Sequence, residues 1–256
     1  MRRTLFIAVV FAVVTGPAKA APSPERHVLR VALEACILAK KVTSRTFPCL
    51  AVDLGDKDRA GTAVLRAPGQ PTHTVVMPTA AVSGLEAPML QGPAGAAYWR
   101  AALAARHSVS DALKGRLSVD DVGLAVNSAG GRSQDQLHIH LDCVVPSVKK
   151  ALQQYASTIG STWEAMPIAV QGRRYFALRL NTDRVADFNP FAALSHLPGR
   201  RTSLKQVSLA MISLQANGGE RLCLFGLPSP SGSCREAARP RLHGRVEVDS
   251  KLSQGV

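Results

Sequence analysis

Two histidines in one short segment have the clearest capacity for chemistry. His138 and His140 lie in the run Gln134–Cys143, where polar and apolar residues alternate. Such alternation predicts a β-strand whose side chains point to opposite faces in turn. The two imidazoles then share one face, about 6–7 Å apart along the strand, and the apolar residues between them face a core. This arrangement indicates either a metal site or a nucleophile with a helper.

Both chemistries, and a structural role, are open to such a pair. A catalytic metal site needs three protein ligands, and the candidates for the third are Asp142, His73 and His107, none with a spacing that favours it. A neutral imidazole can instead attack phosphorus, form a phosphoramidate and be released by water. That reaction requires no metal, but it requires a free ring nitrogen and donors for the phosphate oxygens. In the third interpretation, both histidines are ordinary hydrogen-bonded residues.

The residues before the histidine strand favour attack at phosphorus. A predicted strand ends at Asn127, and a turn containing Gly130 and Gly131 leads to the histidines. Side-chain and backbone donors placed beside the nucleophile are suited to phosphate oxygens. In this interpretation His140 and His138 are the catalytic candidates. The candidates for substrate binding are Asn127, Arg132, Ser133, Gln134 and Asp142.

The elements expected around this strand give the order strand, strand, helix, strand, strand. Apolar residues at helical spacing predict helices over 25–41, 96–117 and 148–156. Alternating patterns between Pro- and Gly-containing turns predict strands over 62–66, 73–77, 122–126 and 136–145. We expect an α+β fold, with an antiparallel sheet and flanking helices.

The second half of the chain repeats this order in a weaker form. The expected strands are 168–170, 175–180, 206–214 and 222–225, with a helix at 188–194. Residues 165–230 are therefore a possible degenerate second half, structural only because it has no His-x-His. We expect the catalytic domain to span 21–240, followed by a loose basic tail at 241–256.

The first twenty residues have the features of a secretory signal peptide. A basic start at Arg2 and Arg3 precedes the apolar run Leu5–Val14, and residues 18–20 form a small-x-small cleavage site. The alternative is a retained membrane anchor, although the run is short of the ~20 residues of a spanning helix. We expect an exported protein, either periplasmic or on the periplasmic face of the inner membrane.

The cysteines and the charge agree with export. Five cysteines leave at least one unpaired, and we expect a disulfide between the neighbours Cys36 and Cys49, with a weaker candidate pair of Cys143 and Cys234. Cleavage after residue 20 would remove three cationic residues and no acidic one, so the net charge would fall from +13 to +10. A basic exported chain without nucleic-acid motifs is expected to meet anionic lipid surfaces or phosphate esters.

The segment Asn127–His140 resembles the histidine-triad (HIT-like) superfamily of nucleotide hydrolases and transferases. In that pattern an Asn ends one strand, a Gly-rich turn follows, and a Gln comes four residues before the first of the alternating histidines. Asn127 and Gln134 both match, which implies His140 as the nucleophile and no cofactor. A register that starts at Gln136 would make His138 the middle member. The third histidine position of the pattern holds Asp142, as in some branches that lack that histidine.

The chain is also similar to the bacterial CDP-diacylglycerol pyrophosphatase family. The similar segments include Leu33–Cys36, Val76–Thr79, Leu85–Pro88 and Leu124–Ser128, and they cover most of the chain beyond the leader. The resemblance implies hydrolysis of CDP-diacylglycerol to CMP and phosphatidate through a nucleotidyl-histidine. It leaves a metal-dependent phosphoesterase or a non-catalytic binder of nucleotides or anionic lipids as alternatives.

A lipid substrate leaves its acyl chains in the bilayer while its headgroup reaches the site. The loop Thr79–Pro93 is a candidate lipid-facing lid, because it carries Val82, Leu85 and Met89. The alternative is that these side chains pack in the core. The sequence does not predict the base preference, the role of Asp142 or the oligomeric state.

Overall fold

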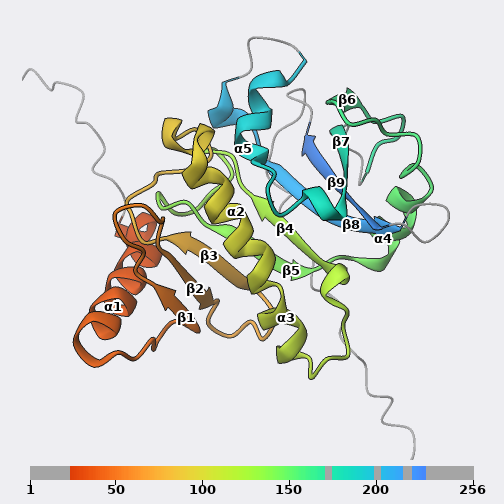
Figure 1. Ribbon diagram of the computed structural model, residues 1–256. Coiled ribbons are helices and arrows are strands. Elements are labelled where there is room, and N and C mark those ends of the chain that lie inside the picture. The colour runs from red at the N-terminus through yellow and green to blue at the C-terminus, as the bar shows by residue number, and fades with distance from the viewer. Residues whose placement is uncertain (1–23, 171–174, 199–202, 216–220, 229–256) are drawn as a thin grey trace, which may run out of the picture.

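The computed structural model describes residues 24–170, 175–198, 203–215 and 221–228. Within these ranges nine strands form one sheet in the order β1-β2-β3-β5-β4-β8-β9-β7-β6, with antiparallel pairing throughout. The expected α+β class is confirmed (Figure 1). The strands are β1 (Ala51–Asp53), β2 (Thr62–Arg66), β3 (Thr74–Pro78), β4 (Val122–Val126), β5 (Ile139–Cys143), β6 (Glu164–Ala165), β7 (Tyr175–Asn181), β8 (Leu209–Gln215) and β9 (Arg221–Pro228).

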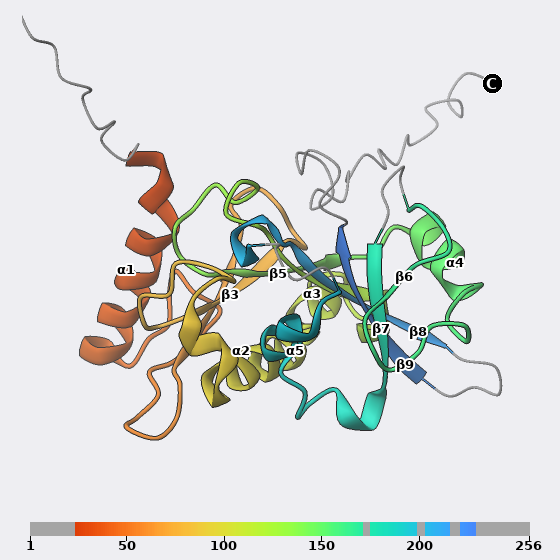
Figure 2. The same cartoon turned by 90° about the horizontal axis from the view of Figure 1, so that it is seen from above.

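Helices cover both faces of the sheet (Figure 2). One face packs against α2 (Pro93–Ala105), α3 (His107–Ala112) and α5 (Pro190–Ala193). The other face is covered at its two ends, by α1 (Val28–Thr43) over β1–β3 and by α4 (Pro146–Gln153) over β7 and β8. Short 3-10 helices are η1 (Pro24–His27), η2 (Pro88–Gln91), η3 (Val119–Asp121), η4 (Thr182–Arg184), η5 (Leu194–His196) and η6 (Leu204–Gln206).

Alternation along the strands divides the buried side chains between the two faces. Ile139 and Leu141 of β5 are fully buried in the large core beneath α2, together with Trp99. Val75 and Met77 of β3 point the opposite way, into the small cluster beneath α1. The histidine side of β5 therefore belongs to the face that α1 and α4 cover only at its ends.

The two halves of the described chain share one connectivity. The first half runs β2, β3, α2, β4, β5 along the chain, and its strands lie in the sheet in the order β2-β3-β5-β4. The second half runs β6, β7, α5, β8, β9 along the chain, and its strands lie in the order β6-β7-β9-β8. The halves meet where β4 pairs with β8. An internal duplication would produce such a repeat. The degenerate second half stays a prediction, and the repeated strand connectivity supports it.

The helix expected over 96–117 is divided. The first part, α2, ends at Ala105, and α3 ends at Ala112. The side chain of Arg106 donates to the carbonyl of Leu103 at 3.2 Å, which satisfies an acceptor at the end of α2. Beyond α3, Gly115 adopts a left-handed conformation with φ of 71°, which glycine tolerates and which stops the helical path.

The loop expected to form a lipid-facing lid is part of the core, so that expectation is wrong. Val82, Leu85 and Leu90 are at most 2% exposed and pack with Trp99. Met89 alone among the apolar residues named for this lid is exposed. The apolar side chains of the loop fill the space beside α2, and this burial stabilises the fold.

The expected disulfide joins Cys36 of α1 to Cys49, thirteen residues later. Both half-cystines are buried beneath α1 with Leu33 and Val52. The bridge holds the helix against the edge of the sheet. Cys143 forms no disulfide among the described residues, and its weaker candidate partner Cys234 lies outside them.

Replacing both Cys36 and Cys49 by Ala is expected to lower the free energy of unfolding by about 3 kcal/mol, because the unfolded chain regains the freedom of a short closed loop. Urea denaturation followed by circular dichroism measures this loss. Reductant should lower the stability of the natural chain by a similar amount and leave the double variant unchanged. Equal stability of the two oxidised proteins would contradict the role assigned to the bridge.

Candidate active site

Three histidines from two neighbouring strands meet on the partly open face of the sheet. His138 and His140 come from the β5 segment, and their ring centroids are 4.7 Å apart in an edge-to-face arrangement. The third ring belongs to His73, which immediately precedes β3 and stacks on His140 with centroids 5.1 Å apart. The sequence associated His73 only with a metal site, so its place beside His140 is new.

The register of the sheet brings these rings together. β3 pairs with β5 so that Val75 is opposite His140. His73 lies two residues before Val75 and therefore on the same face. On the other side of β5, Ala125 of β4 is opposite His140, and Asn127 follows two residues later on that face. A small alanine beside the ring leaves His140 and Asn127 partly exposed.

A relay of hydrogen bonds fixes the tautomer of His140. The Oε1 of Gln70 can only accept, so the Nδ1 of His73 donates to it at 2.9 Å. The Nε2 of the neutral His73 ring then accepts from the Nδ1 of His140 at 2.8 Å. Neutral His140 keeps its lone pair on Nε2, to which the Nδ2 of Asn127 donates at 3.3 Å. The relay therefore leaves Nε2 as the unprotonated ring nitrogen of His140.

The side chain of His138 is less exposed than that of His140, and a hydrogen bond fixes its tautomer as well. It is 5% exposed, and its Nδ1 donates to the carbonyl of Gln136 at 2.6 Å. The Nε2 of the neutral ring is therefore an acceptor. In this form His138 is suited to taking a proton from water or to positioning it, rather than to donating a proton.

Burial keeps both strand histidines neutral. It lowers the pKa of His140 well below its ordinary value, and the neighbouring His138 and His73 act in the same direction. Burial also lowers the pKa of His138, with Arg132 adding to the effect and the bond to Gln136 opposing it. A neutral imidazole is the form that can attack phosphorus.

The loop between β4 and β5 is tied to the beginning of α1. The Oε1 of Gln134 accepts from the backbone N–H of Leu29 at 3.0 Å, an N–H that the first turn of a helix leaves unpaired. Asp135 binds the guanidinium of Arg26 through both carboxylate oxygens at 2.8 Å. The pKa of Asp135 is held well below its usual range, first by this bond. Gln134 therefore has a structural contact, and its expected contact with substrate stays a prediction.

Arg132 is also engaged by the protein. Its side chain is 9% exposed and pairs with Glu86 at 2.8 Å and with Asp135 at 3.3 Å. The guanidinium lies directly over Gly84, where an added Cβ would come within 2.1 Å of Nη1. These contacts hold the loop against the core. The guanidinium of Arg132 already binds two carboxylates of the protein, so its expected contact with substrate stays a prediction.

Replacing Arg132 by Gln is expected to lower the free energy of unfolding by about 3 kcal/mol, because Glu86 loses its cation in a buried setting. Urea denaturation measures the loss. The matched control is Arg26→Gln, which breaks a more exposed pair and should cost much less. Unchanged stability of Arg132→Gln together with a raised KM would contradict the structural role and support substrate binding.

The other expected binding residues lie in different settings. Asp142 shares the histidine face but is 8% exposed, and its Oδ1 accepts from the backbone N–H of Cys143 at 2.8 Å. It is therefore buried rather than turned to solvent. Ser133 is exposed in the loop, where it can reach a ligand. His107, a candidate metal ligand, begins α3 on the other face of the sheet.

The described residues include no group of three or more His, Cys, Asp and Glu side chains that could hold a metal ion. Within the histidine cluster, the Nδ1 of His140 and the Nε2 of His73 are hydrogen-bonded to each other. Both rings would have to turn to bind one ion. The arrangement is suited to nucleophilic attack.

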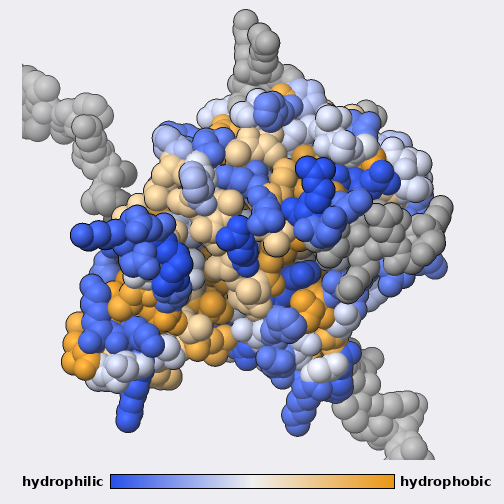
Figure 3. Space-filling view, viewed as in Figure 1, coloured by the Kyte–Doolittle hydropathy of each residue, from blue (hydrophilic) through white to orange (hydrophobic). Residues whose placement is uncertain are grey.

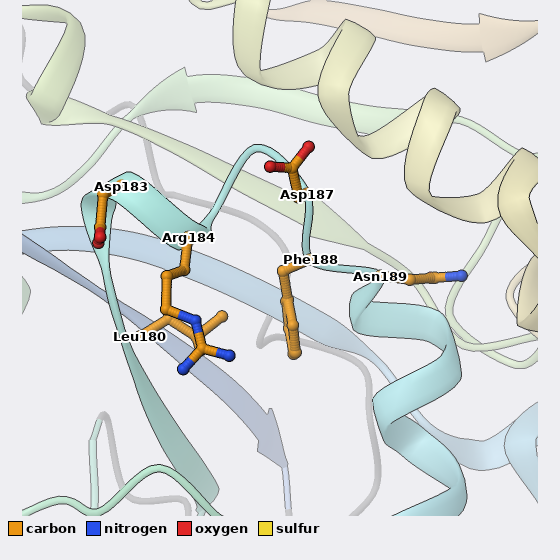
Figure 4. Close-up of a pocket in the computed structure, with 6 residues that line it drawn as sticks. All are labelled: Leu180, Asp183, Arg184, Asp187, Phe188 and Asn189. Carbon is orange, nitrogen blue, oxygen red and sulfur yellow. The ribbon is translucent and has the colours of Figure 1, made fainter.

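One hollow among the described residues is separate from this cluster. It has a volume of 290 Å³ and lies between the end of β7 and the start of α5 (Figure 4). Its lining includes Arg184 and Phe188 and none of the histidines. A second hollow of 520 Å³ adjoins it and shares Phe188 and Asn189. Neither hollow is lined by His73, His138 or His140.

The chain was compared with known proteins. A family model described as CDP-diacylglycerol pyrophosphatase matches residues 24–242, which include the relay and the loop. A protein of Mycobacterium leprae (strain TN) described as a probable CDP-diacylglycerol pyrophosphatase is 35% identical over 196 residues, 71% of each chain. A CDP-diacylglycerol pyrophosphatase of Yersinia pestis is 32% identical over 168 residues, 65% of this chain and 64% of the relative.

Proposed function

The chain belongs to the CDP-diacylglycerol pyrophosphatase family, and from this premise we propose that it hydrolyses CDP-diacylglycerol to CMP and phosphatidate through a covalent bond to His140. The observation that carries the proposal is the relay that leaves the Nε2 of His140 unprotonated on a partly exposed ring, with its lone pair held only by the long contact from Asn127. Membership gives the reaction, and the relay supports His140 as the nucleophile.

In the first step the Nε2 of His140 attacks the phosphorus attached to cytidine. The N–P bond forms as the bond from phosphorus to the bridging oxygen breaks, and phosphatidate leaves with the electron pair. Positive charge develops on the imidazole, which strengthens the hydrogen bond from its Nδ1–H to His73. Asn127, displaced from the ring nitrogen, can donate to a phosphate oxygen.

In the second step water attacks the phosphorus of the CMP-histidine and the N–P bond breaks. The Nε2 of His138, an acceptor in the resting tautomer, is suited to taking the proton of that water. CMP leaves and His140 returns to its neutral form. Ser133, which is exposed in the loop that leads to the histidines, would hold a phosphate oxygen during both steps.

The proposal includes the location of the reaction. The leader at residues 1–20 supports export, and the positive charge of the chain favours an anionic membrane surface. None of the helices in the described part of the chain has the length and apolar character needed to span a bilayer. The similarity of connectivity to the histidine-triad pattern supports placement in that superfamily.

Product analysis tests the proposal. Purified protein incubated with CDP-diacylglycerol should release equal amounts of CMP and phosphatidate, and mass spectrometry after an acid-free quench should detect a nucleotide adduct. Activity should survive exhaustive EDTA treatment; its loss, restored by a divalent cation, would favour the metal-dependent phosphoesterase. Binding of CDP-diacylglycerol without CMP release would favour a non-catalytic binder.

A further inference from the structure

Helix α1 has a second apolar face that no described residue covers. Its inner face packs Leu33 and Cys36 against the sheet. Its outer face carries an apolar stripe, spaced alternately by three and four residues, whose valine and leucine members are 59% to 73% exposed. The stripe consists of Val28, Val31, Ala35, Leu38 and Val42.

The stripe continues into the loop that follows the helix. Phe47 is 82% exposed, and Leu50 is 44% exposed. Figure 3 shows apolar surface gathered at the end of the molecule where α1 lies. Apolar surface concentrated in this way marks an interaction site rather than the scattered exposure that is normal for a soluble surface.

The charges beside the stripe are positive. Glu34 is the single acidic residue of α1, and Arg30 pairs with it at 2.7 Å. Lys41 and Arg45 are exposed at the other end of the helix. A helix with an apolar stripe flanked by lysine and arginine has the pattern of an interfacial helix that lies on an anionic bilayer.

We propose that the outer face of α1 docks on the surface of an anionic lipid bilayer. Two further observations favour a bilayer over a second copy of the chain. The apolar run Leu5–Val14 precedes the described residues, which begin immediately before α1. The substrate of the family also has its acyl chains in a bilayer, a point that rests on the proposed function.

Docking through α1 would bring the bilayer close to the catalytic loop. Gln134 accepts from the backbone N–H of Leu29 and Gln136 from Arg30 at 3.3 Å, both in α1. Asp135 binds Arg26 in the 3-10 helix η1 that precedes α1. The loop that leads to His138 is thus fastened to the docking element. A headgroup at the bilayer surface then meets the histidine face without leaving the membrane.

Tryptophan fluorescence tests the docking. The two natural tryptophans are buried, so Leu38→Trp in the full chain adds a reporter at an exposed position. Vesicles of anionic phospholipid with bromine on the acyl chains should quench this reporter. The matched control is Gln154→Trp, an exposed position next to α4 at the far end of the sheet from α1, which should not be quenched.

The two tryptophan variants carry the same N-terminus, so a retained anchor cannot produce a difference between them. Equal quenching at both positions, or none at position 38, would overturn the proposal. A spectrum of Leu38→Trp that shifts to shorter wavelength with protein concentration, in the absence of vesicles, would show that a second copy covers the stripe and would also overturn it.

Kinetics separate this inference from the proposed function. The triple variant Val31→Ser, Leu38→Ser, Val42→Ser should hydrolyse a water-soluble CDP ester at the natural rate. Its rate on CDP-diacylglycerol in anionic vesicles should fall at least about tenfold, since burial of even one such side chain shifts an equilibrium by that factor. Equal rates on vesicles would reject docking. Quenching of Leu38→Trp by vesicles, together with a natural chain that hydrolyses neither substrate, would reject the proposed function alone.

Discussion

Replacement of His140 by Ala is expected to lower kcat/KM for CDP-diacylglycerol by about four to six powers of ten, as removal of a nucleophile does in other covalent enzymes. The physical reason is that the relay orients one lone pair, on His140 Nε2, toward the open face. Of the other two imidazoles, His138 is buried, and the Nε2 of His73 accepts from His140. Release of CMP from substrate in detergent micelles measures the effect.

The control for this variant is His107→Ala. His107 is exposed at the start of α3, on the other face of the sheet, and its loss should leave the rate unchanged. Mass spectrometry should find the nucleotide adduct in the natural chain and in the control, and not in His140→Ala. A folded His140→Ala variant with normal turnover would reject the covalent mechanism.

The pair of histidines was predictable because it depends on local alternation alone. Period-two spacing places His138 and His140 on one face whatever the rest of the fold does, and the apolar partners between them are buried as expected. The Cys36–Cys49 bridge was also accessible, since a short separation beside a predicted helix limits the choice.

Contacts that depend on strand register could not be read in this way. His73 and His140 are 67 positions apart, and they meet only because β3 pairs with β5 so that Val75 is opposite His140. The sequence of β3 alone does not predict which residue of β5 lies opposite Val75. The same limit applies to Gln134, which matches a phosphate-binding pattern but contacts the first turn of α1 through a packing that local spacing does not reveal.

Burial was the other property that local patterns misjudged. The loop Thr79–Pro93 has the composition of a mobile apolar lid, yet Val82 and Leu85 fill the large core beside Trp99. In contrast, the outer stripe of α1 is exposed although its residues are apolar. A helix with apolar residues on two faces does not indicate from its sequence which face meets the sheet.

Replacement of His73 by Phe is expected to lower kcat about 10- to 100-fold with little change in KM, the range seen when the partner that orients a catalytic imidazole is lost. Phenylalanine cannot accept the hydrogen of His140 Nδ1, so the relay no longer selects the tautomer with a free Nε2. His73 touches His140 rather than the reacting phosphorus in this scheme and is a positioning residue. Steady-state kinetics on micellar substrate measure both constants.

The conservative variant His73→Gln separates positioning from packing. A glutamine oxygen can accept from His140 Nδ1, so kcat should recover most of the loss seen with Phe. The pH profile should change in His73→Gln, which keeps the acceptor but removes the imidazole, because the pKa of His140 is lowered first by burial and further by His138 and His73. Without His73 that pKa rises, His140 becomes protonated at a higher pH as the solution is acidified, and the acidic limb of kcat/KM moves to higher pH. Equal kcat in the two variants, or an acidic limb that stays in place, would show that His73 only fills space beside the nucleophile.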